Sequence, residues 1–298
     1  MLDVRRLGLL CDLARLGTIA AVADVRAYTP SAVSQQLSAL EREAGTPLLE
    51  RTGRRVTLTP AGRILVQHAG TVLAALERAE SALAAASTGL TGELRIGAFP
   101  TAIRTMLTPA LVTLGEQHAA LDLLLAELDP AEVPAALLDR RLDVGLIQDY
   151  DVVPHQVEPG LDSVPLLDET VHLAVAAPGD ALTDFAGADW ILATPGTLCH
   201  TATLRICRAA GFTPRARHRI DDFGTVLALV SAGQGVAVVP QLATGRLPAG
   251  VRLLPVPTRR RTRVAFRRGA AAHPAVAAFL AALPGDTDAA VRPPDLPA

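Results

Sequence analysis

The sequence predicts a multidomain α/β protein with a small helical N-terminal unit, one long helix, and a larger unit in which strands and helices alternate. Two short amphipathic segments come before Gly45, and an apolar repeat with alternating steps of four and three residues follows within 65–86. From Glu93 onwards, short apolar runs typical of strands alternate with helical segments. A chain of 298 residues, 50% of them hydrophobic, can bury the cores of two domains.

Charge and cysteine content exclude several classes of protein. The net charge is -2, but residues 1–63 hold nine Arg and six acidic residues, so this region is basic and the remainder acidic. Such asymmetry is typical of a nucleic-acid-binding module joined to a neutral domain. No apolar run approaches the ~20 residues of a membrane span and no secretory signal follows the first charges, so we expect a cytoplasmic protein without a membrane partner. The Cys and His residues lack metal-ligand spacing, and we expect no metal, no cofactor and no catalytic residues.

The N-terminal segment predicts a helix-turn-helix. An apolar face through 7–14 indicates a first amphipathic helix that Gly17 closes, and Thr18 can cap a second helix through 20–23. Thr29 and Pro30 then start a third helix, because threonine caps a helix N-terminus and proline suits its first position. Two short helices joined by a tight turn are typical of this motif.

The third helix has two contrasting faces. Val33, Leu37 and Leu40 form an apolar stripe. The opposite face carries short polar side chains where a solvated helix normally carries long charged ones, and short side chains let a helix lie close against base edges and phosphates. The alternative for this segment alone is a polar helix on an enzyme surface.

A basic hairpin and a long helix follow. Thr52-Gly53-Arg54-Arg55 lies between two apolar segments and predicts a wing that meets the phosphate backbone, with a solvated turn as the alternative. Thr59-Pro60 starts the long helix, whose apolar repeat is that of a coiled-coil seam. The seam can pack on the protein's own core, but we favour dimerisation because nothing nearby in the sequence supplies a partner. The dimerisation residues are then Leu65, Ala69, Val72, Leu76, Ala79 and Leu83.

The rest of the chain predicts an α/β domain with largely parallel sheets, after a hinge-like linker at 87–92. Residues 252–267 are expected to form two strands, 274–283 a last helix, and the tail from Pro284 to be disordered. The other expected strands are 94–98, 121–126, 143–147, 171–176, 190–193, 215–220 and 236–239, with helices near 101–117, 130–140, 200–210 and 222–232.

The N-terminal motifs resemble the LysR-type transcriptional regulators. The resemblance is dense over about the first 65 residues and looser beyond, where Asp143-Val144-Gly145-Leu146 and 233–240 fit. The motifs that carry it are Thr18-Ile19-Ala20-Ala21-Val22-Ala23, Thr29-Pro30-Ser31-Ala32-Val33-Ser34-Gln35-Gln36-Leu37, Gly45-Thr46-Pro47-Leu48-Leu49-Glu50-Arg51 and Val56-Thr57-Leu58-Thr59-Pro60-Ala61-Gly62. Thr29-Pro30 and Leu49 depart from the family's commonest pattern without removing a polar position that faces the bases.

The resemblance implies a winged helix-turn-helix at 1–59, with the helix-turn-helix at about 18–37, a linker helix at 60–88 that pairs two chains, and an effector-binding domain at 89–298. That domain would be periplasmic-binding-protein-like, with one subdomain at about 92–163 and 266–284 and another at about 164–265. Family members are typically tetramers, so we expect a homodimer to homotetramer that binds promoter DNA and a small-molecule effector.

Residue chemistry gives the expected DNA contacts. A glutamine side chain can pair with adenine through two hydrogen bonds, and serine can bond to several bases. Base edges are assigned to Pro30, Ser31, Ser34 and Gln35, and phosphates to Thr29, Ser38, Arg51 and Arg54.

Two similar turns predict the effector site. Residues 96–101 and 191–197 both pass from a strand to a helix N-terminus through an X-Pro step and a threonine, which would present N–H groups and hydroxyls to one crevice. A carboxylate or an amino acid is the expected effector, and ordinary helix capping is the alternative role for these residues. The candidates are Phe99, Thr101, Thr197, Cys199, His200, Thr201, Asp221, Asp222 and Phe223.

Two other functions are weighed. The resemblance implies a thiol-based redox sensor using Cys199 and Cys207 as one alternative, because one branch of the family senses peroxide with a cysteine pair in this region, and His200 and a helix N-terminus would lower the pKa of Cys199. Eight residues along one helix span about 12 Å, which is too far for a disulfide unless the helix unfolds. An enzyme or a solute-binding protein that uses the α/β domain is the second, but the sequence holds no nucleophile motif or phosphate loop and the His residues are scattered.

Overall fold

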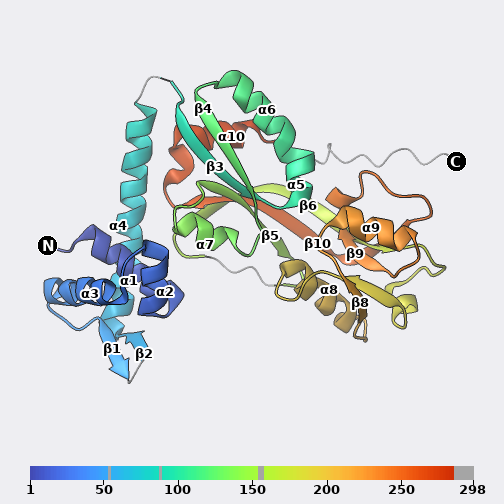
Figure 1. Cartoon of the computed structure of the whole chain (residues 1–298), viewed down its shortest axis with the longest axis horizontal. Helices are drawn as coiled ribbons and strands as arrows, with labels where there is room; N and C mark the ends of the chain where they lie inside the picture. The colour runs from blue at the N-terminus through green and yellow to red at the C-terminus, as the bar shows by residue number, and fades with distance from the viewer. Residues whose placement is uncertain (53–54, 87–88, 154–157, 285–298) are drawn as a thin grey trace. The chain divides into compact units, whose positions relative to one another are not determined.

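The computed structural model describes residues 1–52, 55–86, 89–153 and 158–284, except the side chains of Arg51, Thr52 and Arg55. Contacts divide the chain into two compact units: Met1–Thr88 with Arg267–Pro274, and Gly89–Phe266 with Ala275–Ala298. Figure 1 labels their elements. The expected linker residues 87–88 and the tail from residue 285 lie outside the described residues.

The first unit contains the predicted helix-turn-helix and long helix. Each helix begins at a side chain that accepts a hydrogen bond from the first turn, namely Asp3, Thr18, Thr29 and Thr59. Helices α1 and α3 end at a glycine with positive φ, as the sequence predicted. The elements are α1 (Val4–Leu16), α2 (Ile19–Arg26), α3 (Pro30–Ala44), the antiparallel hairpin of β1 (Leu49–Thr52) and β2 (Arg55–Leu58), α4 (Pro60–Ala85) and the short η4 (Ala270–Ala272).

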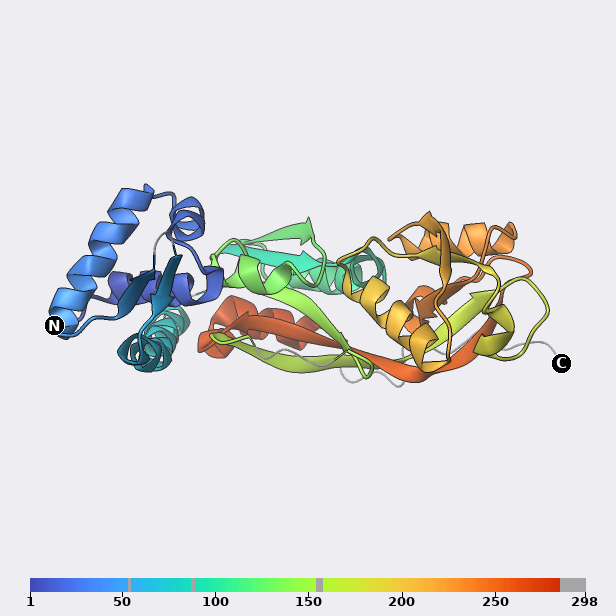
Figure 2. The same cartoon turned by 90° about the horizontal axis from the view of Figure 1, so that it is seen from below.

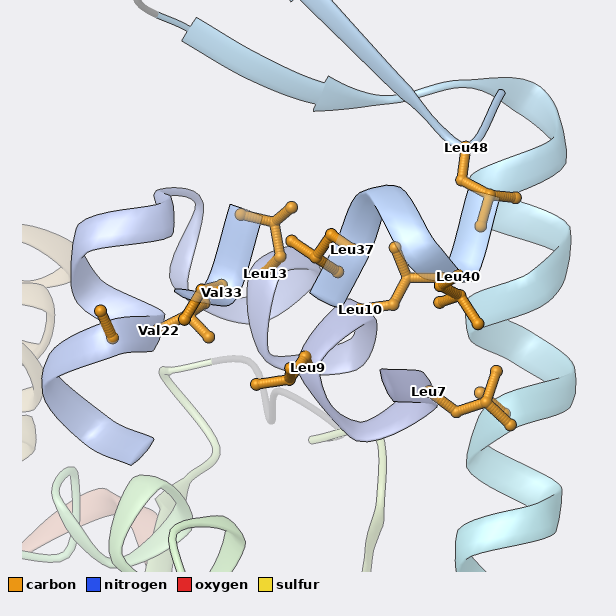
Figure 3. Close-up of a cluster of buried hydrophobic side chains, with 11 residues drawn as sticks. Leu7, Leu9, Leu10, Leu13, Val22, Val33, Leu37, Leu40 and Leu48 are labelled. Carbon is orange, nitrogen blue, oxygen red and sulfur yellow. The ribbon is translucent and has the colours of Figure 1, made fainter. Parts of the chain in front are cut away.

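Leucines from α1 and α3 form the core of the helix-turn-helix (Figure 3). Leu10, Leu37 and Leu40 are each no more than 1% exposed, and Leu48, just before β1, closes the cluster. Burying each leucine stabilises the fold by about 1.5–3 kcal/mol. Because the apolar stripe of α3 is buried in this core, the polar face of α3 points away from the core.

Helix α4 divides its apolar repeat between two surroundings. Leu65 and Ala69 pack against the core of the helix-turn-helix, so the expectation that nothing in the chain would cover the seam is wrong for these two residues. Farther along, Val72, Leu76 and Leu83 are 40%, 41% and 73% exposed. The N-terminal part of α4 therefore packs in the chain's own core, and its C-terminal part keeps an exposed apolar stripe.

A different face of α4 packs on the turn at 267–274. Glu77 Oε1 lies 2.9 Å from Arg267 Nε, and both side chains are largely buried. Ser81 Oγ donates to Glu77 O at 2.8 Å and lies 3.4 Å from Gly269 O. Gly269 has φ +98°, and an added Cβ would lie 2.5 Å from Ala74 O, so only glycine fits this approach.

The second unit is built on a mixed sheet. In the described residues its strand order is β4-β3-β5-β10-β6-β9. Strand β3 pairs in parallel with β4 and β5, whereas β10 is antiparallel to β5 and β9 is antiparallel to β6. The expected largely parallel arrangement is thus wrong for this sheet, because β10 and β9 run antiparallel to their neighbours β5 and β6. These strands are β3 (Gly92–Ala98), β4 (Leu121–Glu127), β5 (Val144–Tyr150), β6 (Leu161–Val175), β9 (Ala237–Pro240) and β10 (Arg252–Arg267).

Two long strands join the two lobes of this unit. Strands β6 and β10 are neighbours in the sheet and run along the unit together, as Figure 2 shows. Residues 252–267 form the single strand β10, not the two strands expected, and β6 begins at Leu161, ten residues before the expected start at 171.

Helices cover the sheet in both lobes. The first lobe holds α5 (Pro100–Ala102), the π-helix η1 (Ile103–Leu107), α6 (Thr108–Gln117) and α7 (Val133–Leu138), and α10 (Pro274–Ala282) follows η4. In the second lobe a small parallel sheet of β7 (Asp189–Leu192) and β8 (Arg215–Arg219) joins η2 (Leu182–Phe185), α8 (Leu198–Ala209), α9 (Phe223–Ser231) and η3 (Gln241–Ala243). Trp190, fully buried, packs at 5.8 Å between ring centroids against Phe212.

Candidate DNA-binding and effector sites

The predicted DNA contacts share the exposed face of α3. Pro30, Ser31 and Gln35 are exposed, and Ser34 and Ser38 are half-buried on the same side. Thr29 Oγ1 accepts a hydrogen bond from Ala32 N at 3.2 Å, so this residue acts as the N-cap. The side chain of Arg51 and the whole of Arg54 lie outside the described residues.

Helix α1 contacts α3 through a hydrogen bond and an ion pair of Arg6. Arg6 Nε donates to Gln36 Oε1 at 2.8 Å, and the same guanidinium forms an ion pair with Glu43. Asp12, only 5% exposed, joins α1 to α2 through Arg26 Nε at 2.6 Å. These pairs fix the angle between the helices and leave the serines and Gln35 on the outer face.

The expected effector residues fall into two groups in the α/β unit. Phe99, at the end of β3, and Cys199, in the first turn of α8, come together around Arg260 of β10. Thr101 is buried nearby at the start of α5, where its carbonyl accepts from Thr105 Oγ1 at 2.8 Å.

The second group serves local structure. Thr197 caps α8 by accepting from His200 N at 3.2 Å, and its carbonyl accepts from Thr201 Oγ1 at 3.2 Å. Asp221 accepts from both the backbone N and the hydroxyl of Thr194, at 2.8 and 2.7 Å. The turn at 191–197 is thus held by internal bonds, which is the capping alternative given by the sequence.

Asp222 and Phe223 open α9. Asp222 caps the helix by accepting from Thr225 N at 2.8 Å, and this bond, with help from Arg104, lowers the pKa of the carboxyl. Arg104 Nη1 lies 3.4 Å from Asp222 Oδ2 and comes from the π-helix η1 of the first lobe. Phe223 packs against the core of the second lobe.

Arg260 is the centre of the first group. Its side chain is 1% exposed, and its Nε donates to Glu169 Oε1 at 2.7 Å. Glu169 Oε2 accepts from Leu242 N at 2.6 Å, and the Phe99 ring centroid lies 5.3 Å from the guanidinium carbon. Burial acts to lower the pKa of Arg260, but Glu169, Tyr150 and Cys199 together outweigh it, so the pKa is raised and the guanidinium stays charged.

Two neutral acids complete this group. Tyr150 OH and Cys199 Sγ are 3.4 Å apart. Burial raises the pKa of Tyr150 well above its usual range, and burial also raises the pKa of the Cys199 thiol, although Arg260 and the Tyr150 hydroxyl act to lower it. The expectation that the helix N-terminus and His200 would lower the pKa of Cys199 is therefore wrong, because desolvation is the larger effect.

Sequence reasoning missed Arg260, Glu169 and Tyr150. Along β10 the alternate residues Val256 to Val264 point inward, and Arg260 falls on the same face as these valines. The alternation of side chains along a strand, which places Arg260 at an inward position, was the sequence signal that could have identified this residue. Arg259 and Arg261 on either side are more exposed, so composition alone does not distinguish Arg260 from its neighbours.

Other site types find no support in the described part of the chain. No group of three or more His, Cys, Asp or Glu among these residues could hold a metal ion. None of the described helices is both long and apolar enough to cross a membrane.

Comparisons with known proteins match both units. Residues 4–63 match the family described as bacterial regulatory helix-turn-helix protein, lysR family, and residues 87–286 match the LysR substrate binding domain. A probable hydrogen peroxide-inducible genes activator of Streptomyces viridosporus is 32% identical, over 87% of this chain and 89% of that protein. The nitrogen assimilation regulatory protein nac of Escherichia coli is 30% identical, over 84% and 82%.

Solved structures agree. The Corynebacterium glutamicum OxyR C206 mutant is 26% identical with a TM-score of 0.52, covering 95% of this chain and 93% of that one. CbnR, a LysR family transcriptional regulator, shares the fold at 24% identity and a TM-score of 0.52, over 94% and 99%. With a helix-turn-helix that exposes a small polar face, an α/β unit of two lobes and family models that span both, the chain belongs to the LysR family of transcriptional regulators.

Proposed function

We propose that this regulator reads promoter DNA with the exposed face of α3 and responds to a small molecule bound around Arg260. The observation that carries the DNA assignment is the row of short polar side chains on a helix whose apolar side is fully buried. We assign DNA binding to 1–59, dimerisation to 60–88 and effector binding to 89–298, with subdomains at about 92–163 plus 266–284 and 164–265. Because its ligand is chromosomal DNA, we place the protein in the cytoplasm.

Base and phosphate contacts are separable by their salt dependence. Gln35→Ala is expected to relax sequence preference by about 1–3 kcal/mol at one base pair. Arg54→Ala is expected to weaken cognate and random duplexes equally and to reduce the salt slope by about 1. Gln67→Ala, an exposed position on α4, is the control. Equal loss on both duplexes for Gln35→Ala, with a changed salt slope, would refute its assignment to a base edge.

Dimerisation rests on the uncovered stripe of α4. Val72, Leu76, Ala79 and Leu83 are exposed apolar residues at steps of four, three and four, and a second α4 is the partner that such a repeat fits. Val72→Ser with Leu76→Ser is expected to yield monomers in sedimentation experiments and to abolish binding to a two-half-site duplex. An unchanged sedimentation coefficient would show that the chains pair elsewhere.

The second candidate function is a thiol-based response to peroxide. Its support is the name of several relatives, probable hydrogen peroxide-inducible genes activators, and the position of Cys199 beside Arg260. Against it, Cys199 and Cys207 share the intact helix α8, and burial raises the pKa of both thiols. Thiol titration before and after peroxide decides: loss of two free thiols with altered DNA binding would establish it, and an unchanged count would dismiss it.

A further inference from the structure

Buried polar atoms without partners gather in one row of the α/β unit. Among the described residues, seven buried side-chain nitrogen or oxygen atoms have no hydrogen-bond partner. Three are ring nitrogens of scattered histidines. The other four are Gln148 Nε2, Thr258 Oγ1, Arg260 Nη2 and Thr262 Oγ1. Arg260 Nη2 lies 2.7 Å from Glu169 Oε1 and forms an ion pair with it, but the geometry of this contact does not meet the angles of a hydrogen bond.

Strand register explains why these atoms lie together. Thr258, Arg260 and Thr262 alternate along β10, so their side chains leave the same face of the sheet. Thr262 is the cross-strand partner of Gln148, and Arg260 is the partner of Tyr150. The polar row, defined as Gln148, Thr258, Arg260 and Thr262, therefore occupies one face of β5 and β10 and extends for about 13 Å along β10 at ~3.3 Å per residue.

These atoms are deeply buried. Thr258, Arg260 and Thr262 are 5%, 1% and 1% exposed. Native proteins rarely leave such groups unpaired, because an unpaired buried donor keeps its desolvation cost without a compensating bond. Three unpaired groups therefore lie beside the ion-paired Arg260, whereas the other buried non-histidine side chains of the described residues have partners, and this indicates groups available to a ligand.

The charge of the row is balanced internally. Glu169 neutralises Arg260 and has both oxygens occupied, one by Arg260 and one by Leu242 N. Tyr150 and Cys199, which flank the pair, stay uncharged at neutral pH because burial raises the pKa of each. The nearest further charges that act on Cys199 are the negative Asp129 and Asp221. An incoming carboxylate would find no uncompensated cation here and would have to be desolvated.

We propose that the polar row binds a neutral small molecule with several acceptor oxygens, of the amide or polyol class. The proposal rests on the proposed effector function and replaces the carboxylate or amino acid expected from the sequence. Gln148 and Arg260 donate to the ligand's oxygens, and the two threonine hydroxyls donate or accept as the ligand requires. The length of the row calls for oxygens spread along the molecule.

The first test needs no ligand. Thr262→Val keeps the side-chain shape and removes a hydroxyl without a partner, so the melting temperature of the full-length protein is expected to rise by about 2–4 °C. Thr203→Val is the matched control: Thr203 is also buried, but its hydroxyl donates to Cys199 O at 2.9 Å, so this variant is expected to melt lower. A lower melting temperature for Thr262→Val would show that its hydroxyl is already satisfied and would overturn the proposal.

The second test compares matched neutral and anionic probes. Acetamide and acetate, succinamide and succinate, and xylitol and xylonate are titrated into the full-length protein by thermal shift and calorimetry. Neutral members are expected to raise the melting temperature of the parent chain, with an at least tenfold weaker effect in Thr262→Val and Gln148→Leu. Binding by the anions alone, by none of the neutral members, or equally in the variants overturns the proposed class.

The same samples separate this proposal from the proposed function. Fluorescence anisotropy with promoter and random duplexes reports on α3 and is independent of the polar row. Preference for promoter DNA with no neutral probe bound leaves the regulator function standing and overturns the ligand class alone. If the parent chain shows no preference for promoter over random duplexes, the proposed regulator function is overturned instead.

Discussion

Gly62, at the third position of α4, is predicted to be irreplaceable by alanine. A Cβ built there would lie 2.2 Å from Leu48 O and 3.3 Å from Leu58 Cδ2. Leu48 O already accepts from Thr59 N at 2.9 Å, and Gly62 N donates to Thr59 Oγ1 at 2.9 Å. The methyl group would therefore push the start of α4 away from the segment that enters the wing.

The magnitude follows from opposing effects. Forcing a methyl group into a packed site costs about 1–3 kcal/mol, and the weakened bond to Leu48 O costs about 1 kcal/mol. Better helix propensity returns up to about 1 kcal/mol. Gly62→Ala should therefore destabilise the first unit by about 1–3 kcal/mol. Gly70→Ala, in the same helix with nothing within 4 Å of the added Cβ, should stabilise it by up to about 1 kcal/mol.

Urea unfolding followed by far-ultraviolet circular dichroism measures both variants in the full chain. The two midpoints are expected to move in opposite directions, and duplex binding by Gly62→Ala is expected to weaken because the wing and α3 share this core. Equal midpoints for the two variants would refute the argument that Leu48 O closes the space at Gly62.

Two further predictions concern buried ionisable groups. Glu77→Gln removes the carboxylate that faces the largely buried Arg267, so we expect a loss of about 3 kcal/mol and faster hydrogen exchange in the part of α4 near Ser81, whereas Gln67→Ala, exposed on the same helix, should cause neither. Burial raises the pKa of Cys207 from 9.0 to about 12, so the stabilising contribution of the neutral thiol is complete below the unfolded pKa and is lost as the pH rises from 9.0 towards 12. In urea titrations at alkaline pH, Cys207→Ala should therefore lose less stability with rising pH than the parent protein. Parallel curves of stability against pH for the two proteins would contradict this.

Local chemistry predicted the DNA-binding unit well. Thr18, Thr29 and Thr59 cap helices where the sequence placed them, and Gly17 and Gly45 adopt positive φ at helix ends. Caps and amphipathic stripes act over one or two helical turns, so a single segment contains all the information they need. The small polar face of α3 followed directly from the same period.

The effector region was only partly predictable. Phe99 and Cys199 were named from turns at strand ends, but Asp221 and Thr197 satisfy polar groups of the turn at 191–197 themselves. Capping and ligand binding use the same residue types, so sequence alone cannot separate them. The pKa of Cys199 was also misjudged, since desolvation depends on what covers a thiol and not on its neighbours in the chain.

What the sequence determined by itself was the order of elements and the face of α3 that carries short polar side chains, because both depend on short-range periodicity, while the resemblance of its N-terminal motifs indicated the family. Tertiary structure alone decided that β6 and β10 run as long neighbouring strands through both lobes and that Leu65 and Ala69 join the chain's own core. It also decided that Arg260 meets Glu169, ninety-one residues away, beside three unpaired polar side chains. Strand register and burial arise from contacts between distant segments, and these set the charge and the unsatisfied hydrogen bonds of the site.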